Sequence, residues 1–184
     1  MSDSQDGGRV EQAGDLAGLM GRYQAGEIDA FDQLYAALAP PLLQYLTSLS
    51  RDGTLARDLL QECFLQIHRA RRSYRPGLPL RPWAFAIARH VWLMDRRARS
   101  RRPVADRALE DLPVPSDVAR LADRQTLARA LANVVPERRE ALLLHHVWGF
   151  TFAEIGQMLG IRADAAKLRS SRGMADLRRE LVRP

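Results

Sequence analysis

The chain has 184 residues, and 46% of them are hydrophobic, enough for one packed core or two small ones and too many for wholesale disorder. It carries 28 Lys and Arg residues against 22 acids, and this net charge of +6 favours a polyanionic partner, nucleic acid before membrane. Cys63 is the only cysteine, which excludes an intramolecular disulfide and a cysteine-based zinc site.

The N-terminal sequence MSDSQDGGRVEQAGD is polar and acidic and has no apolar core segment. It therefore does not resemble a signal peptide, and we expect residues 1–12 to form a disordered tail. No run in the chain approaches the roughly 18 apolar residues that a membrane-spanning helix needs. These observations predict a cytoplasmic protein with no membrane insertion.

Apolar residues then recur at helical spacing, and no strand-like alternation stands out. The spacing predicts a short helix over residues 16–23 and a second one over 31–38. Pro40 and Pro41 follow, and we expect them to interrupt that helix, because proline lacks a backbone donor and clashes with the preceding turn. Helical spacing resumes over 42–49, before a turn at Asp52-Gly53.

A further helix is predicted from Thr54 to about Arg72. On it, Asp58, Gln61 and Glu62 share one face, whereas Leu59, Cys63 and Phe64 lie toward the other. An acidic strip beside an apolar stripe suits a basic partner helix. A solvated amphipathic helix would show the same pattern, and the residues alone leave both readings open.

The segment RPGLPLRP predicts a loop, and a long helix is expected from about Pro82 to Arg101. Its end concentrates positive charge that suits phosphates, carried by Arg96, Arg97, Arg99, Arg101 and Arg102. Trp83 and Phe85 can stack on exposed bases beside such a patch, or they can belong to the core.

Residues 103–117 contain three prolines and four acids with little periodicity, which predicts a linker. We therefore expect an all-α protein of two small helical domains joined by a flexible linker, the domains covering residues 13–102 and 118–184. In the second domain, Pro136 is expected to start a helix that ends near Gly149.

The C-terminal stretch TFAEIGQMLGIRADAAKLRSSRGMADLRREL has the pattern of a helix-turn-helix. Thr151 and Glu154 form a predicted capping box, the helix runs to Leu159, and Gly160 permits a tight turn. The second helix begins at about Ala163 and presents basic side chains that suit phosphates and guanine edges: Lys167, Arg169, Arg172, Arg178 and Arg179. The alternative is a helical hairpin with a solvated basic face.

The stretch VPERREALLLHHVWGFTFAEIGQMLGI resembles the promoter-binding C-terminal domain of bacterial sigma factors of the extracytoplasmic-function class. The matching residues are Pro136, Arg138, Gly149, Glu154, Ile155, Leu159 and Gly160. The resemblance implies that the following helix binds the minus-35 promoter element through Arg162, Ala163, Lys167, Leu168, Arg169, Ser171 and Arg172.

Two residues of that helix depart from the family pattern. Ser170 and Gly173 replace larger apolar residues on the face that should pack inward, so we expect the recognition helix to be less firmly seated. Leu168 would either compensate for part of that packing or face a thymine methyl group.

Two stretches of the first domain resemble the same family. DLLQECFLQI is similar to the helix that docks on the beta-prime subunit of RNA polymerase, which implies contacts by Asp58, Gln61 and Glu62. WAFAIARHVWLMDRRAR is similar to the helix that recognises and opens the minus-10 element. That similarity implies DNA contacts by Trp83, Arg89, His90, Asp95, Arg96, Arg97 and Arg99, with His90 in place of the usual asparagine, and base capture by the loop 75–81.

The resemblance implies a sigma factor, a binding and strand-opening subunit rather than an enzyme, with no metal and no cofactor. Its expected partners are core RNA polymerase (beta-prime and beta subunits), promoter DNA and an anti-sigma factor. One alternative is a helix-turn-helix repressor or activator that binds duplex DNA alone. Another is an enzyme, but the chain shows no carboxylate cluster, metal spacing or phosphate loop. The last alternative is an adaptor protein that has lost DNA binding.

Overall fold

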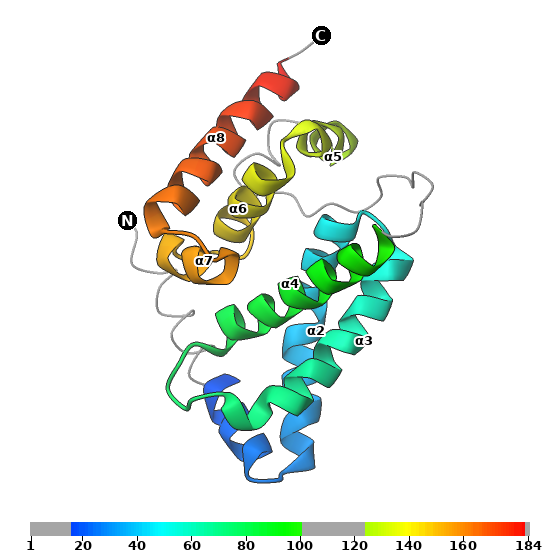
Figure 1. Cartoon of the computed structure of the whole chain (residues 1–184), viewed down its shortest axis with the longest axis vertical. Helices are drawn as coiled ribbons and strands as arrows, with labels where there is room; N and C mark the ends of the chain where they lie inside the picture. The colour runs from blue at the N-terminus through cyan, green and yellow to red at the C-terminus, as the bar shows by residue number, and fades with distance from the viewer. Residues whose placement is uncertain (1–15, 101–123, 183–184) are drawn as a thin grey trace.

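The computed structural model describes residues 16–100 and 124–182, and within them every regular element is a helix. The first group packs in the lower half of Figure 1 and comprises helical residues 16–24, α2 (Ile28–Ser50), α3 (Gly53–Ala70), the short 3-10 helix η1 (Arg71–Ser73) and α4 (Leu80–Arg99). The second group lies above it and comprises α5 (Arg124–Asn133), α6 (Pro136–His146), α7 (Phe152–Leu159) and α8 (Ala163–Leu181).

The expected break at Pro40-Pro41 is wrong, because α2 continues through both prolines to Ser50. A proline inside a helix costs about 3 kcal/mol or more. Leu38 and Leu42, on either side of the pair, are almost completely buried, and burying one leucine contributes about 1.5–3 kcal/mol. The apolar stripe is therefore continuous across the prolines, and packing outweighs their local preference.

The next two helices begin where the sequence indicates. The Asp52 carboxylate accepts hydrogen bonds from the backbone N–H groups of Thr54 and Leu55 and so caps α3. After η1 and the loop, α4 begins at Leu80, so Pro82 lies in its first turn, where a missing donor is harmless. Helices α2, α3 and α4 pack against one another around Leu46, Phe64 and other buried side chains.

The second group is a four-helix unit in which α8 lies across α6 and α7 and also contacts α5. Pro136 is in the first turn of α6, as predicted. The capping box at the start of α7 is confirmed, because Thr151 and Glu154 exchange side-chain and backbone hydrogen bonds.

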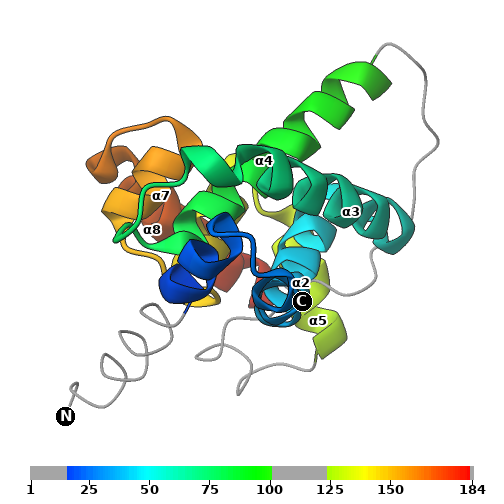
Figure 2. The same ribbon diagram turned by 90° about the horizontal axis from the view of Figure 1, so that it is seen from below.

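The two groups pack directly on each other, a contact that the sequence did not predict. Figure 2 shows α7 close to the first turns of α4, and the two helices are in contact. Four aromatic side chains meet there: the Phe85 ring lies 5.0 Å from Tyr45, 5.6 Å from Trp148 and 4.8 Å from Phe150, between ring centroids. The residues expected to form the linker, 103–117, lie outside the described part of the chain.

Candidate nucleic-acid interface

The turn between α7 and α8 depends on glycine at two places. Gly160 has a φ of 68°, in the left-handed region that glycine adopts without strain. A Cβ at Gly156 would lie 2.7 Å from the Ile161 carbonyl oxygen, so only glycine lets the chain after the turn approach α7 this closely. Together they bring α8 back across α7, the arrangement of a helix-turn-helix.

Helix α8 is packed tightly against α6, and the expectation of a loose recognition helix is not met. Ser170 and Gly173 are buried, and a Cβ at Gly173 would lie 2.8 Å from the Arg138 carbonyl oxygen. The small residues therefore let the two backbones approach, instead of leaving a gap. Arg138 then joins the helices with a 2.7 Å ion pair from Nη1 to Asp176, and its hydrogen bond lowers the pKa of that carboxyl group.

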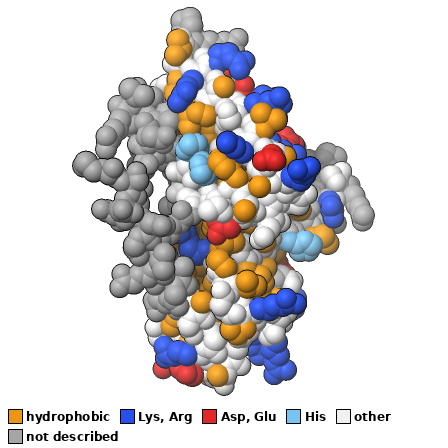
Figure 3. All heavy atoms as spheres, turned by 90° about the vertical axis from the view of Figure 1, so that its left-hand side faces the viewer, with side chains coloured by type: hydrophobic (Ala, Val, Ile, Leu, Met, Phe, Trp, Pro, Cys, Tyr) orange, Lys and Arg blue, Asp and Glu red, His pale blue; other side chains and the backbone are white. Residues whose placement is uncertain are grey.

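The outward face of α8 carries most of the predicted minus-35 residues. Ala163, Lys167, Leu168, Ser171 and Arg172 are exposed, as is Arg162 immediately before the helix. Arg169 is half-buried at the edge of this face, so it is less accessible than its neighbours. Figure 3 shows Lys and Arg side chains spread over one side of the molecule, including its upper half, where α8 lies.

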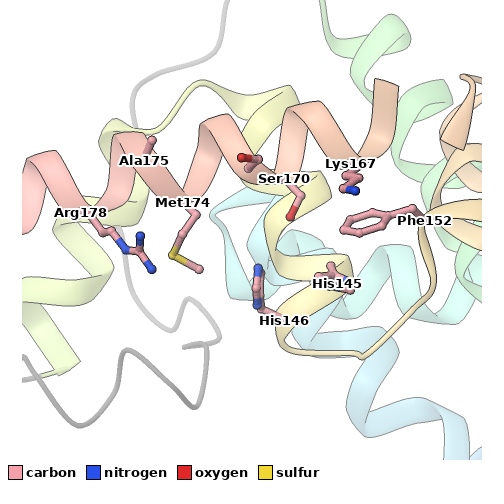
Figure 4. A pocket seen from close by; sticks show the side chains of 9 residues that line it. His145, His146, Phe152, Lys167, Ser170, Met174, Ala175 and Arg178 are labelled. Atoms are coloured by element: carbon pink, nitrogen blue, oxygen red, sulfur yellow. The ribbon is translucent and has the colours of Figure 1, made fainter. Parts of the chain in front are cut away.

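A shallow groove of about 360 Å³ runs along one flank of α8. In Figure 4, Lys167, Ser170, Met174 and Arg178 of α8 lie on one side of it, and His145, His146 and Phe152 lie on the other. The His145 ring stacks on Phe152 with 4.2 Å between centroids, and its Nδ1 lies 2.9 Å from the Phe150 carbonyl oxygen. The groove thus places two histidine rings, His145 and His146, beside the basic face of α8.

The end of α4 forms a second basic surface. Arg96, Arg97 and Arg99 are exposed there, and His90 is exposed near the middle of the same helix. Arg99 forms a 2.9 Å ion pair with Asp95, so two of the residues expected to contact DNA are paired with each other within the helix. The Arg96 guanidinium lies over the Trp92 ring, 5.2 Å from its centroid. This surface presents cations at short intervals, as phosphate binding requires.

The aromatic residues of α4 separate into two classes. Phe85 is completely buried and belongs to the core. Trp83 is partly exposed and packs edge-on against Tyr74, whose hydroxyl donates to the Leu78 carbonyl across the loop. Trp83 thus borders the loop that was expected to capture a base.

Arg89 is tied to the other group of helices. Its Nε donates to Oε1 of Glu140 on α6 at 2.9 Å, and the Tyr45 hydroxyl donates to the same oxygen at 2.7 Å. Burial, followed by the charge of Glu140, raises the pKa of Tyr45. Sequence reasoning missed Glu140, because a glutamate within an arginine-rich helix start gives no sign of being buried.

The acidic strip on α3 faces solvent, as predicted. Asp58, Gln61 and Glu62 are exposed, whereas Leu59, Cys63 and Phe64 on the same helix are buried. Glu62 accepts a hydrogen bond of 2.6 Å from Gln66, one turn later. The strip therefore forms a polar ridge with its apolar side fixed in the core.

Within the described residues, no group of three or more His, Cys, Asp or Glu side chains is placed to hold a metal ion. No helix in that part of the chain is long and apolar enough to cross a bilayer.

Comparison with known families identifies both groups of helices. A family model described as Sigma-70 region 2 matches residues 34–102, and one described as Sigma-70, region 4 matches residues 124–177. The first match contains α3 and α4, and the second contains the helix-turn-helix.

Similar proteins agree over most of the chain. The RNA polymerase sigma factor CarQ of Myxococcus xanthus is 38% identical over 86% of this chain and 93% of its own length. The ECF RNA polymerase sigma factor SigM of Mycobacterium tuberculosis is 31% identical over 95% of this chain and 88% of its own. Among solved structures, the sigma factor RpoE of Bartonella quintana, in complex with the anti-sigma factor NepR, superposes with a TM-score of 0.73 at 25% identity. The match covers 84% of this chain and 98% of that one.

Proposed function

The chain belongs to the extracytoplasmic-function sigma factors of the sigma-70 family, and from that membership we propose how its surfaces divide the work of promoter recognition. The α3 ridge of Asp58, Gln61 and Glu62 docks on core RNA polymerase. The basic end of α4 binds and opens the minus-10 element. The outward face of α8 binds the minus-35 element.

The observation that carries this proposal is the order of the three surfaces on one chain. A polar ridge, a basic helix end and a helix-turn-helix follow one another within two matches to regions of the same family. A repressor or activator with a helix-turn-helix needs no docking helix, so the first domain favours a polymerase subunit.

We further propose that an anti-sigma factor controls this protein. The support is the likeness to RpoE, which was solved in complex with the anti-sigma factor NepR. As a DNA-binding initiation factor it would work in the cytoplasm and carry out no covalent chemistry of its own.

The test is promoter-dependent transcription with purified components. Core polymerase supplemented with this chain should initiate at specific promoters, and core polymerase alone should not. If the chain bound duplex promoter DNA tightly alone and gave no specific initiation with core polymerase, it would be an ordinary regulator and the proposal would be wrong.

A further inference from the structure

Leu168 is a large apolar side chain left exposed in the middle of a basic surface. It lies in the second turn of α8 and is 50% exposed. Its sequence neighbours are Lys167 and Arg169, and Arg172 lies one turn further on, four residues along the helix. The structure thus rules out that Leu168 compensates for lost core packing.

The outward direction of Leu168 is fixed by the way α8 is seated. The close approach of Gly173 to the Arg138 carbonyl and the 2.7 Å ion pair from Arg138 to Asp176 hold the helix on α6 at two points. Rotation about the helix axis would drive the backbones together at Gly173 or break that ion pair. At about 100° per residue, the buried side of α8 therefore sets which side chains face out, and Leu168 is among them.

The position of Leu168 matches where a recognition helix reads bases. In helix-turn-helix proteins the N-terminal residues of the second helix reach base edges in the major groove. Arg172, one turn further along the outward face, is suited to a nearby phosphate, whereas Lys167 is exposed on the flank that borders the groove of about 360 Å³. A leucine cannot donate or accept a hydrogen bond, and the base feature that an apolar side chain reads in the major groove is the thymine 5-methyl group.

We propose that Leu168 selects a thymine in the minus-35 element by contact with its 5-methyl group. This inference rests on the proposed function, because it requires that α8 bind the minus-35 DNA. Beyond that function, it names thymine as the base that Leu168 recognises. If Leu168 were instead committed to the neighbouring Val135 and Ala165, with which it lines a groove of about 290 Å³, no base methyl group would matter.

The experiment removes single methyl groups from the DNA. A minus-35 element is first selected from randomised promoters with the holoenzyme, and each thymine on both strands is then replaced by deoxyuridine. At one position we expect holoenzyme affinity to fall about fourfold, the factor that corresponds to about 0.8 kcal/mol for one buried methyl group. Leu168→Ala should weaken binding to the thymine promoter and abolish the thymine–uracil difference at that position alone.

Val182→Ala is the matched control, because Val182 is an exposed apolar residue just past the end of the same helix, 83% exposed. This variant should keep the full thymine–uracil difference. The proposal is overturned if no uracil substitution changes affinity, or if Leu168→Ala leaves the difference intact. Failure of the proposed function gives a different result, since the holoenzyme would then select no minus-35 sequence at all.

Discussion

Lys167 and Arg172 are both exposed on α8, but they border different grooves and lie at different distances from the start of the helix. Lys167 is near the N-terminal end, the part of the recognition helix that reads base edges in helix-turn-helix proteins, and Arg172 is more than one turn later, where we expect a phosphate contact. We expect Lys167→Ala to cost about 1–3 kcal/mol at one base position and to relax specificity there. Arg172→Ala should weaken binding to all promoter sequences alike, and it should reduce the slope of log affinity against log salt concentration by about 1.

Binding curves on single-base promoter variants at several salt concentrations separate these roles. Arg179→Ala serves as a comparison, because Arg179 is already paired with Asp176 at 2.8 Å and should change little. Equal losses on every promoter variant for Lys167→Ala would show that this residue reads no base.

Cys63 is the single thiol of the chain, and its surroundings make it unreactive. It is completely buried on α3, and burial, followed by the charge of Glu62, raises its pKa to about 12. Because the thiolate is the nucleophile, the neutral thiol at pH 8 should resist iodoacetamide. Mass spectrometry should find Cys63 unmodified in the native protein and alkylated in the denatured protein. Rapid native modification would instead open the possibility of redox sensing.

At the scale of the element, α3 carries core residues on one face and an exposed polar ridge on the other. Asp58→Ala with Gln61→Ala removes two exposed side chains and should leave the melting temperature nearly unchanged, because surface substitutions usually stay within about 0.5 kcal/mol. Co-purification with core polymerase should nonetheless be lost.

The matched control for the α3 ridge is Asp32→Ala with Gln33→Ala, an equally exposed acid and amide on α2. This pair should bind core polymerase normally. Undiminished binding by the α3 variant would contradict the docking assignment.

The surroundings of two helical glycines, Gly173 on α8 and Gly18 near the N-terminus, predict opposite effects on stability when each is replaced by alanine. Gly173→Ala places a methyl group 2.8 Å from the Arg138 carbonyl oxygen and should destabilise the fold by about 1–3 kcal/mol. Gly18→Ala has nothing within 4 Å and lies within helical residues 16–24, so it should stabilise by up to about 1 kcal/mol. Urea denaturation measures both. A neutral Gly173→Ala would mean that α6 and α8 are not in close contact.

Local signals in the sequence predicted most elements, because their causes lie within a few residues. The capping box at Thr151 and the first-turn Pro136 each depend on neighbours along the chain, and both predictions were confirmed. The helix break predicted at Pro40-Pro41 was wrong, because the packing that outweighs these prolines comes from helices distant in the sequence. The close contact of Gly173 with the Arg138 backbone was also not predicted, because a glycine in the sequence does not indicate which segment will pack against it.

At the scale of the whole molecule, the two domains are held together by polar contacts between residues far apart in sequence. Glu140 on α6 receives hydrogen bonds from Tyr45 and Arg89, and Arg51 donates to the Ala132 carbonyl oxygen at 2.8 Å. Arg89 is one of the residues expected to contact the minus-10 element, whereas the α3 ridge remains exposed. In this closed arrangement the α3 ridge is accessible, whereas the Arg89 guanidinium is engaged by Glu140.

Two promoter elements separated by roughly 16 base pairs lie about 54 Å apart at ~3.4 Å per step, so we expect the domains to separate when both elements are bound. We expect Glu140→Gln to favour separation, because a neutral amide replaces the charged acceptor of one buried and one part-buried hydrogen bond, and a hydrogen bond to a charged group is worth about 1.5–3 kcal/mol. Energy transfer between dyes attached through Arg57→Cys on α3 and Ala175→Cys on α8, both exposed, reports the distance. The buried Cys63 should remain unlabelled.

The labelled chain that keeps Glu140 should show high energy transfer that falls when core polymerase is added. Glu140→Gln should already lower it without polymerase, and Glu137→Gln, an exposed carboxylate on the same helix, should not. Because opening also releases Arg89, the Glu140 variant should bind minus-10 single-stranded DNA more tightly than the wild type in the absence of polymerase. Equal energy transfer in all three proteins would mean that the aromatic contact of Tyr45, Phe85, Trp148 and Phe150 holds the domains together without help from Glu140.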